Sequence, residues 1–164
     1  MKTLYIIRHA KSSWSDASIS DIERPLNERG KKDAPVMAQK LLDKKIKIDA
    51  FVSSPAKRAK KTCQAFCKIF KIDKKEIVLI DELYNAAGEN FYNAIASLDD
   101  KIKRVAIFSH NPGITDFVNS LVPGVVIDNM PTCAVFAVEA DIQDWKDFRS
   151  APNKFLFFDY PKHS

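Results

Sequence analysis

Short, mostly apolar segments alternate along this chain with segments in which apolar residues recur at helical spacing. Runs of this kind are typical of strands buried on both faces, as in parallel sheets covered by helices. Four such runs occupy residues 4–7, 48–53, 77–80 and 105–109. Two more, 134–138 and 155–158, have no clear helix between them, which favours antiparallel pairing at one edge. We therefore expect an α/β fold: a three-layer α/β/α sandwich whose central sheet is mostly parallel, with an antiparallel edge strand.

Capping residues mark where several helices should begin. Asn27 is expected to cap a helix whose apolar stripe includes Leu41, and Pro35 inside it implies either a kink or a fresh start capped by Asp33. Ser54-Pro55 and Asn111-Pro112 each read as a cap followed by a first helical residue. With 164 residues and no linker long enough to divide it, the chain is expected to form a single domain, residues 1–164.

The composition favours a reduced, cytoplasmic protein and makes a metal site improbable. Three cysteines form no disulfide framework, and Cys63 and Cys67, one helical turn apart among apolar residues, are interpreted as core. The only histidines are His9, His110 and His163, which are too few and too scattered for a typical zinc site. No signal peptide opens the chain, and no apolar run approaches the roughly 20 residues of a membrane span.

A cluster of positive charge leaves a second class of function open. Eight Lys and Arg residues lie between Lys57 and Lys75, and the net charge is +5. These cations could serve a non-catalytic module that binds phosphate or nucleic acid, but a solvated helix surface explains them better, since the interleaved aromatic residues of a single-strand-binding surface are missing. We expect no nucleic-acid partner and no membrane partner.

Arginine and histidine residues follow three of the predicted strands. The first strand ends in Arg8-His9, the second is followed by Arg58 about one helical turn later, and the fourth ends in Ser109-His110. Because parallel strands share one carboxyl end, these side chains should meet on one rim of the sheet. Guanidinium groups match phosphate oxygens, and helix N-termini add partial positive charge. Arg58 alone would be read as a surface residue and His110 alone as a structural histidine, so their joint placement carries the argument for a phosphoryl site.

The same segments resemble the histidine phosphatase (phosphoglycerate mutase-like) superfamily. Within it, residues 8–14 (RHAKSSW) and 23–30 (ERPLNERG) are similar to the small SixA-type phosphohistidine phosphatases. The resemblance implies that His9 attacks phosphorus and becomes phosphohistidine, while Arg8, Arg58 and His110 bind the phosphoryl oxygens. It implies substrate-binding roles for Arg24 and Ser15. It also implies that no metal ion or cofactor takes part.

Two departures from the superfamily pattern bear on the substrate. Ala10 stands where glycine is usual, and Asn85 stands where larger relatives carry a glutamate that protonates the leaving oxygen. Asp81 and Glu82 lie close by in sequence and could substitute. A phosphohistidine leaving group can be protonated from solvent, since imidazole titrates near pH ~6.5. We therefore expect hydrolysis of phosphohistidine on a protein; the alternative is a phosphatase for small phosphate monoesters. The loop of residues 11–23 is polar, with Trp14 as its one core-like residue, and the sequence does not decide whether this loop closes over the substrate.

Overall fold

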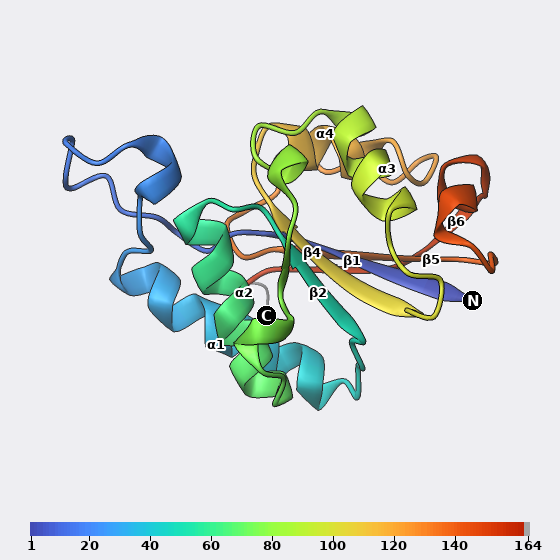
Figure 1. The fold of residues 1–164 in the computed structure, drawn as a ribbon, viewed down its shortest axis with the longest axis horizontal. Helices are drawn as coiled ribbons and strands as arrows, with labels where there is room; N and C mark the ends of the chain where they lie inside the picture. The colour runs from blue at the N-terminus through green and yellow to red at the C-terminus, as the bar shows by residue number, and fades with distance from the viewer. Residues whose placement is uncertain (163–164) are drawn as a thin grey trace.

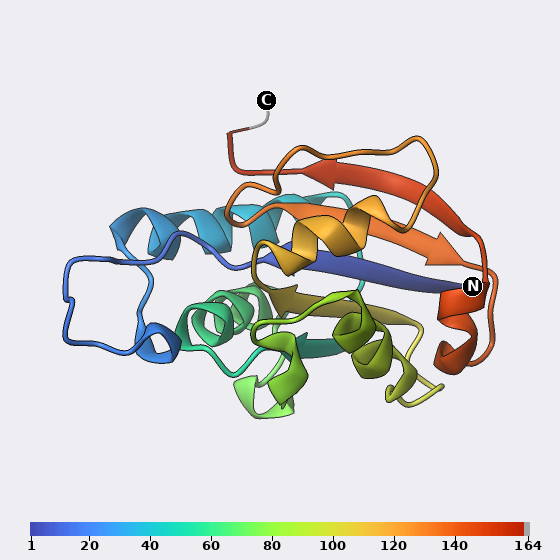
Figure 2. The same cartoon turned by 90° about the horizontal axis from the view of Figure 1, so that it is seen from above.

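A six-stranded sheet forms the middle layer of the protein. The computed structural model describes residues 1–162. The strands are β1 (Lys2–Arg8), β2 (Ala50–Ser53), β3 (Val78–Leu79), β4 (Arg104–Ser109), β5 (Val135–Ala140) and β6 (Asn153–Asp159). They lie in the order β3-β2-β4-β1-β5-β6, and Figure 2 shows β1 near the middle of the sheet. The first strand along the chain therefore has neighbours on both sides.

The parallel part of the sheet brings the carboxyl ends of three strands together. β4 pairs in parallel with β1 and with β2, so that Arg8 lies opposite Ser109 and Ser53 opposite Phe108. β5 runs antiparallel to β1, and β6 runs antiparallel to β5. The predicted antiparallel pairing is thus present on one side of the sheet, but the reversed strand is β5, one place in from the edge.

Helices cover both faces of the sheet. α1 (Glu28–Asp43) and α2 (Lys57–Phe70) lie on one face, and α3 (Gly88–Ala96) and α4 (Gly113–Asn119) lie on the other (Figure 1). Short 3₁₀ turns complete the chain: η1 (Asp21–Glu23), η2 (Lys74–Glu76), η3 (Asp81–Leu83) and η4 (Trp145–Ser150). Each face of the sheet has its own apolar core, and alternate residues of β1 contribute to the two cores: Leu4 and Ile6 to one, Tyr5 and Ile7 to the other. The three-layer α/β/α prediction is confirmed.

One predicted helix start is confirmed and two are wrong. The Asn27 side chain accepts a hydrogen bond from the Gly30 N–H, and α1 continues through Pro35 without a fresh start at Asp33. The helix after β2 begins at Lys57 rather than Pro55, with Ala56 at the cap position, while the Ser54 hydroxyl accepts from the Ala56 N–H. The helix after β4 begins at Gly113, and the side chain of Asn111 contacts Asn129 and Thr115 instead of capping it.

The cysteines behave as predicted, and one aromatic residue does not. Cys63, Cys67 and Cys133 are buried free thiols, and the first two belong to the core between the sheet and the helix pair α1 and α2. Trp14, which the sequence interpretation treated as the one core-like residue of its polar loop, has 77% of its surface exposed. Across residues 1–162, none of the helices has the length and apolar character required to cross a membrane.

Candidate active site

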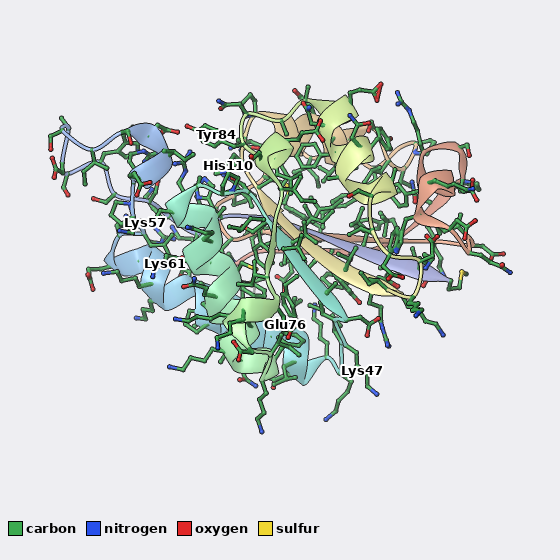
Figure 3. The ribbon with its side chains drawn as sticks, viewed as in Figure 1. Lys47, Lys57, Lys61, Glu76, Tyr84 and His110 are labelled. Carbon is green, nitrogen blue, oxygen red and sulfur yellow. The ribbon has the colours of Figure 1, made fainter. Side chains whose placement is uncertain are left out.

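A pocket of about 420 Å³ opens beyond the carboxyl ends of β1, β2 and β4. Its walls come from six parts of the chain: the end of β1, the loop of residues 11–23, α2, and the segments after η3, β4 and α4. Figure 3 shows two contributors to this region, His110 and Tyr84, side by side above the sheet. The residues lining the pocket are Arg8, His9, Lys11, Ser12, Trp14, Asp21, Arg24, Arg58, Asn85, His110, Asn111 and Thr132.

His9 is held as a neutral ring of defined tautomer. Its backbone N–H donates to Ser109 O (3.1 Å), which fixes the residue against the end of β4. The ring Nδ1 lies 2.6 Å from Ala10 O; a carbonyl can only accept, so Nδ1 carries the proton. Burial lowers the pKa of His9 to about 3, with a further lowering by the nearby arginines. The ring is therefore uncharged near neutral pH, and its nucleophilic lone pair is on Nε2.

Thr62 connects this histidine to α2. The Ala10 N–H donates to Thr62 Oγ1 (2.9 Å), and the Thr62 hydroxyl donates to Arg58 O (2.8 Å). Thr62 is buried completely. One hydroxyl thus ties the residue that orients His9 to the turn of α2 that carries Arg58.

Arg8 lies at the floor of the pocket with part of its hydrogen-bonding capacity free. Its Nη1 donates to Met130 O (2.8 Å), while its buried Nε has no partner. The Cys133 N–H donates to the carbonyls of both Arg8 and His9, with Cys133 in a left-handed conformation (φ 63°). Burial and the charge of Arg58 lower the pKa of Arg8. This guanidinium is held close to other positive charge without an anion of its own.

Asp21 is a carboxylate that the sequence interpretation missed. Its Oδ2 accepts from Arg58 Nη2 (3.0 Å) and from the Tyr84 hydroxyl (2.5 Å), and its Oδ1 accepts from Arg24 Nε (3.2 Å). The Tyr84 hydroxyl, followed by the two arginines, lowers the pKa of Asp21 to about 2, and the same contact with Asp21 raises the pKa of Tyr84. No pattern in the Ser- and Asp-rich loop distinguished Asp21 from its neighbours, since two of its partners, Arg58 of α2 and Tyr84 after η3, are distant in the sequence.

His110 is the second buried imidazole of the pocket. Its Nε2 lies 2.7 Å from Ser54 Oγ, and its Nδ1 is buried without a partner. The ring centroids of His110 and His9 are 5.0 Å apart. Burial, then the neighbouring His9 and Arg58, lower the pKa of His110 to about 3. Ser54, which was predicted as a helix cap, therefore belongs to the site. Its hydroxyl contacts His110 and also accepts from the Ala56 N–H in the turn before α2.

Arg24 reaches the pocket from the loop after β1, whereas Ser15 does not. Arg24 Nη1 contacts Ser12 Oγ (2.7 Å), and its guanidinium carbon lies 3.4 Å from the centre of the Trp14 ring. Ser15 is exposed, pairs with the Ser13 hydroxyl at 2.8 Å, and is not among the residues lining the pocket. In this part of the loop, Ser12 and Trp14 line the pocket instead.

Asn85 lines the pocket, and the two nearby acids do not. Asn85 has a left-handed backbone (φ 57°), which asparagine tolerates better than most residues. Glu82 accepts from Asn90 and Asn93 of α3, and neither Asp81 nor Glu82 lines the pocket. Among the residues the structure describes, Asp21 is therefore the one carboxylate in the pocket wall.

The charges of the pocket favour a dianion. Arg8, Lys11, Arg24 and Arg58 face one carboxylate, and both imidazoles are neutral. Within residues 1–162, the buried Nε atoms of Arg8 and Arg58 have no hydrogen-bond partner, which is costly unless a ligand supplies an acceptor. No group of three or more His, Cys, Asp or Glu side chains within residues 1–162 could hold a metal ion, and His163 lies outside the described residues.

Known proteins with similar sequence or structure agree with this description. Residues 4–89, more than half of the chain, match the sequence model of the histidine phosphatase superfamily (branch 1). The chain is 27% identical to phosphohistidine phosphatase SixA of Escherichia coli K12 over 140 residues, covering 84% of this chain and 85% of that protein. The family match, residues 4–89, includes Arg8-His9 at the end of β1 and Arg58 after β2.

Solved structures extend the likeness to the whole chain. A candidate phosphohistidine phosphatase SixA from Agrobacterium tumefaciens superposes with a TM-score of 0.81 at 28% identity, covering 98% of each chain. A protein histidine phosphatase SixA complexed with tungstate superposes with a TM-score of 0.82 at 23% identity, covering 97% of each chain, which supports the fold. The six-stranded sheet with helices on both faces is thus the phosphoglycerate mutase-like fold.

Proposed function

The chain belongs to the histidine phosphatase superfamily and is a phosphatase with a histidine nucleophile, and we propose that it hydrolyses phosphohistidine on proteins. In this proposal His9 is the nucleophile and carries the phosphoryl group between the two steps. The observation that carries it is the hydrogen bond of 2.6 Å from His9 Nδ1 to Ala10 O. That bond and the low pKa of His9, about 3, supply a neutral ring with its lone pair on Nε2.

In the first step, His9 Nε2 attacks phosphorus while the bond from phosphorus to the substrate nitrogen breaks. Negative charge spreads over the equatorial phosphoryl oxygens in such a transfer. Arg8, Arg58 and His110 are proposed to bind these oxygens, and Arg24 to reach them from the loop. The unpartnered Nε atoms of Arg8 and Arg58 support this assignment. Because three arginines supply the positive charge, we propose that the reaction requires no metal ion.

The chemistry of the leaving group favours a P–N bond over an alkyl phosphate ester as the bond that is cleaved. An alkoxide leaving group needs a proton donor, and the carboxylate in the pocket wall, Asp21, has a pKa of about 2 and is ionised. Imidazole needs less help, because its distal nitrogen takes a proton from solvent near pH ~6.5 before the bond breaks. The substrate imidazole then leaves neutral. Asn85, which lines the pocket, has no proton of suitable acidity to give.

In the second step, water attacks phosphorus and the bond from His9 Nε2 to phosphorus breaks. The products are inorganic phosphate and His9, whose Nδ1 keeps its proton and its hydrogen bond to Ala10 O throughout. The same arginines serve both steps, because each passes through the same distribution of charge. A covalent intermediate is therefore expected on one histidine.

Trapping that intermediate tests the proposal. Brief mixing with phosphoramidate followed by mass spectrometry should find one phosphate on His9, and His9→Ala should lose both the phosphate and turnover. Lys47→Gln, an exposed residue at the far end of β2 (Figure 3), serves as a control that should react as the parent does. Turnover of phosphohistidine by His9→Ala at the parent rate would show that His9 is not the nucleophile. A higher kcat/KM on an alkyl phosphate than on phosphohistidine would favour a phosphatase for small monoesters instead.

A further inference from the structure

A second hollow adjoins the active-site pocket. Its volume is about 270 Å³, and two residues of its wall, Lys11 and Thr132, also line the pocket that holds His9. The two spaces are therefore neighbours with a common wall. The remaining residues of the hollow come from the first turns of α1, the segment before β5 and the chain after β6: Arg29, Asp33, Pro131, Tyr160, Pro161 and Lys162.

The backbone of the common wall is held closely by its surroundings. The Asn27 N–H donates to Lys11 O (3.0 Å). A Cβ atom on Gly30 would lie 2.1 Å from the same oxygen, so α1 can approach Lys11 only because residue 30 is glycine. On the other side, Thr132 lies between Met130, whose carbonyl accepts from Arg8, and Cys133, whose N–H bonds to Arg8 and His9. These contacts fix the common wall, and therefore the distance between the two hollows.

The second hollow carries an excess of positive charge. Lys11, Arg29 and Lys162 line it together with one acid, Asp33, whose Oδ2 lies 3.4 Å from Arg29 Nε. One of the three cations is therefore paired within the hollow, and the lining keeps a surplus of two. Two prolines give the walls stiff backbone. A charged ligand of such a space would therefore be anionic rather than cationic.

We infer that this hollow binds an acidic side chain of the substrate protein, in the segment that flanks its phosphohistidine. The inference rests on the proposed function and narrows its substrate class. With the phosphoryl group at His9, the substrate chain leaves the pocket across its rim, and the rim at Lys11 leads into the second hollow. Glutamate or aspartate a few residues from the phosphohistidine would reach Arg29 and Lys162 there.

Matched peptides and two double variants test the inference. Two peptides of one length carry a central phosphohistidine, with glutamate in one and glutamine in the other at the flanking positions. The parent protein should show a higher kcat/KM on the glutamate peptide, by about two- to fivefold per charge pair formed. R29Q/K162Q should remove this preference. K47Q/K101Q, which removes two exposed charges at the amino ends of β2 and β4, should keep it.

Phosphoramidate turnover, measured beside the peptides, separates the possible failures. If the parent hydrolyses neither phosphoramidate nor phosphohistidine, the proposed function fails. If it hydrolyses both and does not distinguish the peptides, only the acidic-segment inference is overturned. R29Q/K162Q should retain turnover of phosphoramidate, which shows that it folds. If R29Q/K162Q lost activity only on a small substrate that carries a second phosphate, the inference would also be overturned. The hollow would then bind a small molecule rather than a protein side chain.

Discussion

Asp21 and Arg58 form an ion pair at the mouth of the active-site pocket, with Asp21 Oδ2 lying 3.0 Å from Arg58 Nη2. The same guanidinium donates through Nη1 to the Asp21 carbonyl (2.7 Å). Asp21 therefore accepts hydrogen bonds from both terminal nitrogens of Arg58. A phosphoryl group that uses Arg58 must share it with this carboxylate or displace it. The loop of residues 11–23, which extends beyond the helices in Figure 1, is thereby connected to α2 through the arginine that the substrate is proposed to need.

Replacing Asp21 by asparagine should strengthen the binding of anions. The substitution removes one negative charge beside Arg58 and Arg24 and keeps the size of the side chain. Asp21 is half exposed, so the effect is screened, and we expect the inhibition constant of inorganic phosphate to fall about two- to fivefold. Inhibition of phosphohistidine hydrolysis by phosphate measures it.

Glu23→Gln is the matched control for that measurement. Glu23 belongs to the same 3₁₀ turn and is exposed, but it does not line the pocket. Its loss should leave phosphate inhibition unchanged. Weaker inhibition in Asp21→Asn would show the opposite role for the carboxylate, namely that it holds Arg58 in the orientation that binds phosphate.

Trp14→Leu should raise KM with little change in kcat. The Trp14 ring lies against the Arg24 guanidinium, at 3.4 Å, and Arg24 lines the pocket. A cation–π contact at an exposed site contributes about 0.5–1 kcal/mol, so KM should rise about two- to fivefold. Trp14→Phe keeps an aromatic face and should recover part of the loss. Identical KM values for the parent and Trp14→Leu would show that Arg24 is held by Ser12 and Asp21 alone.

Thr62→Val should lower both stability and turnover. The substitution keeps the shape of the side chain and removes the hydroxyl that joins Ala10 to Arg58, leaving the Ala10 N–H buried without an acceptor. We expect the free energy of unfolding in urea to fall by about 1–3 kcal/mol. Thr62→Ser keeps the hydroxyl and loses one methyl group, at a cost of about 1 kcal/mol. The serine variant should retain more of the parent kcat, and equal kcat in both variants would argue against a positioning role.

The buried imidazoles should make the protein less stable as the pH falls below 6.5. Unfolded histidine titrates near pH ~6.5, whereas folded His9 and His110 have pKa values of about 3. Between these values the unfolded chain binds protons that the folded chain does not, so the free energy of unfolding falls by about 1.4 kcal/mol per pH unit for each ring. Urea unfolding from pH 7 to pH 4.5 measures the slope.

His9→Asn separates the two contributions to that slope. It removes the proton taken up by residue 9 on unfolding, so the slope should drop by about half relative to the parent, and His110→Asn should do the same. The window ends at pH 4.5 because the lowered pKa of Asp21, about 2, adds a slope of the same sign as the unfolded carboxyl begins to take up protons. An unchanged slope in His9→Asn would mean that folded His9 titrates near its ordinary pKa.

Some residues of the site could be predicted because they lie at the ends of buried strands. Arg8 and His9 end β1, and His110 directly follows β4; in a parallel sheet that topology alone brings them together. Arg58 follows from the first turn of the helix after β2. In each case the pattern is local: a short apolar strand is followed by polar residues, and the point where the strand ends places their side chains on the rim of the sheet. Their roles in catalysis stay predictions until the variants are measured.

Local patterns failed where a polar side chain had a distant partner. Ser54 and Asn111 looked like helix caps, but their helices begin later, at Lys57 and Gly113. The Ser54 side chain contacts His110, and the Asn111 side chain contacts Asn129 and Thr115. Asp21 and Trp14 looked like ordinary loop and core residues, although both line the pocket. His110 lies 56 residues from Ser54 and Asn129 lies 18 residues from Asn111, and no spacing rule connects such pairs.

The sequence by itself determined the layered α/β architecture and the gathering of arginines and histidines at one rim, because periodicity and strand order act over short stretches of chain. Only the tertiary structure decided the protonation of the two imidazoles, the pairing of Asp21 with Arg58, and the hollow beside the pocket. Burial and the distances between charges set these properties, and both exist only once remote segments have packed together.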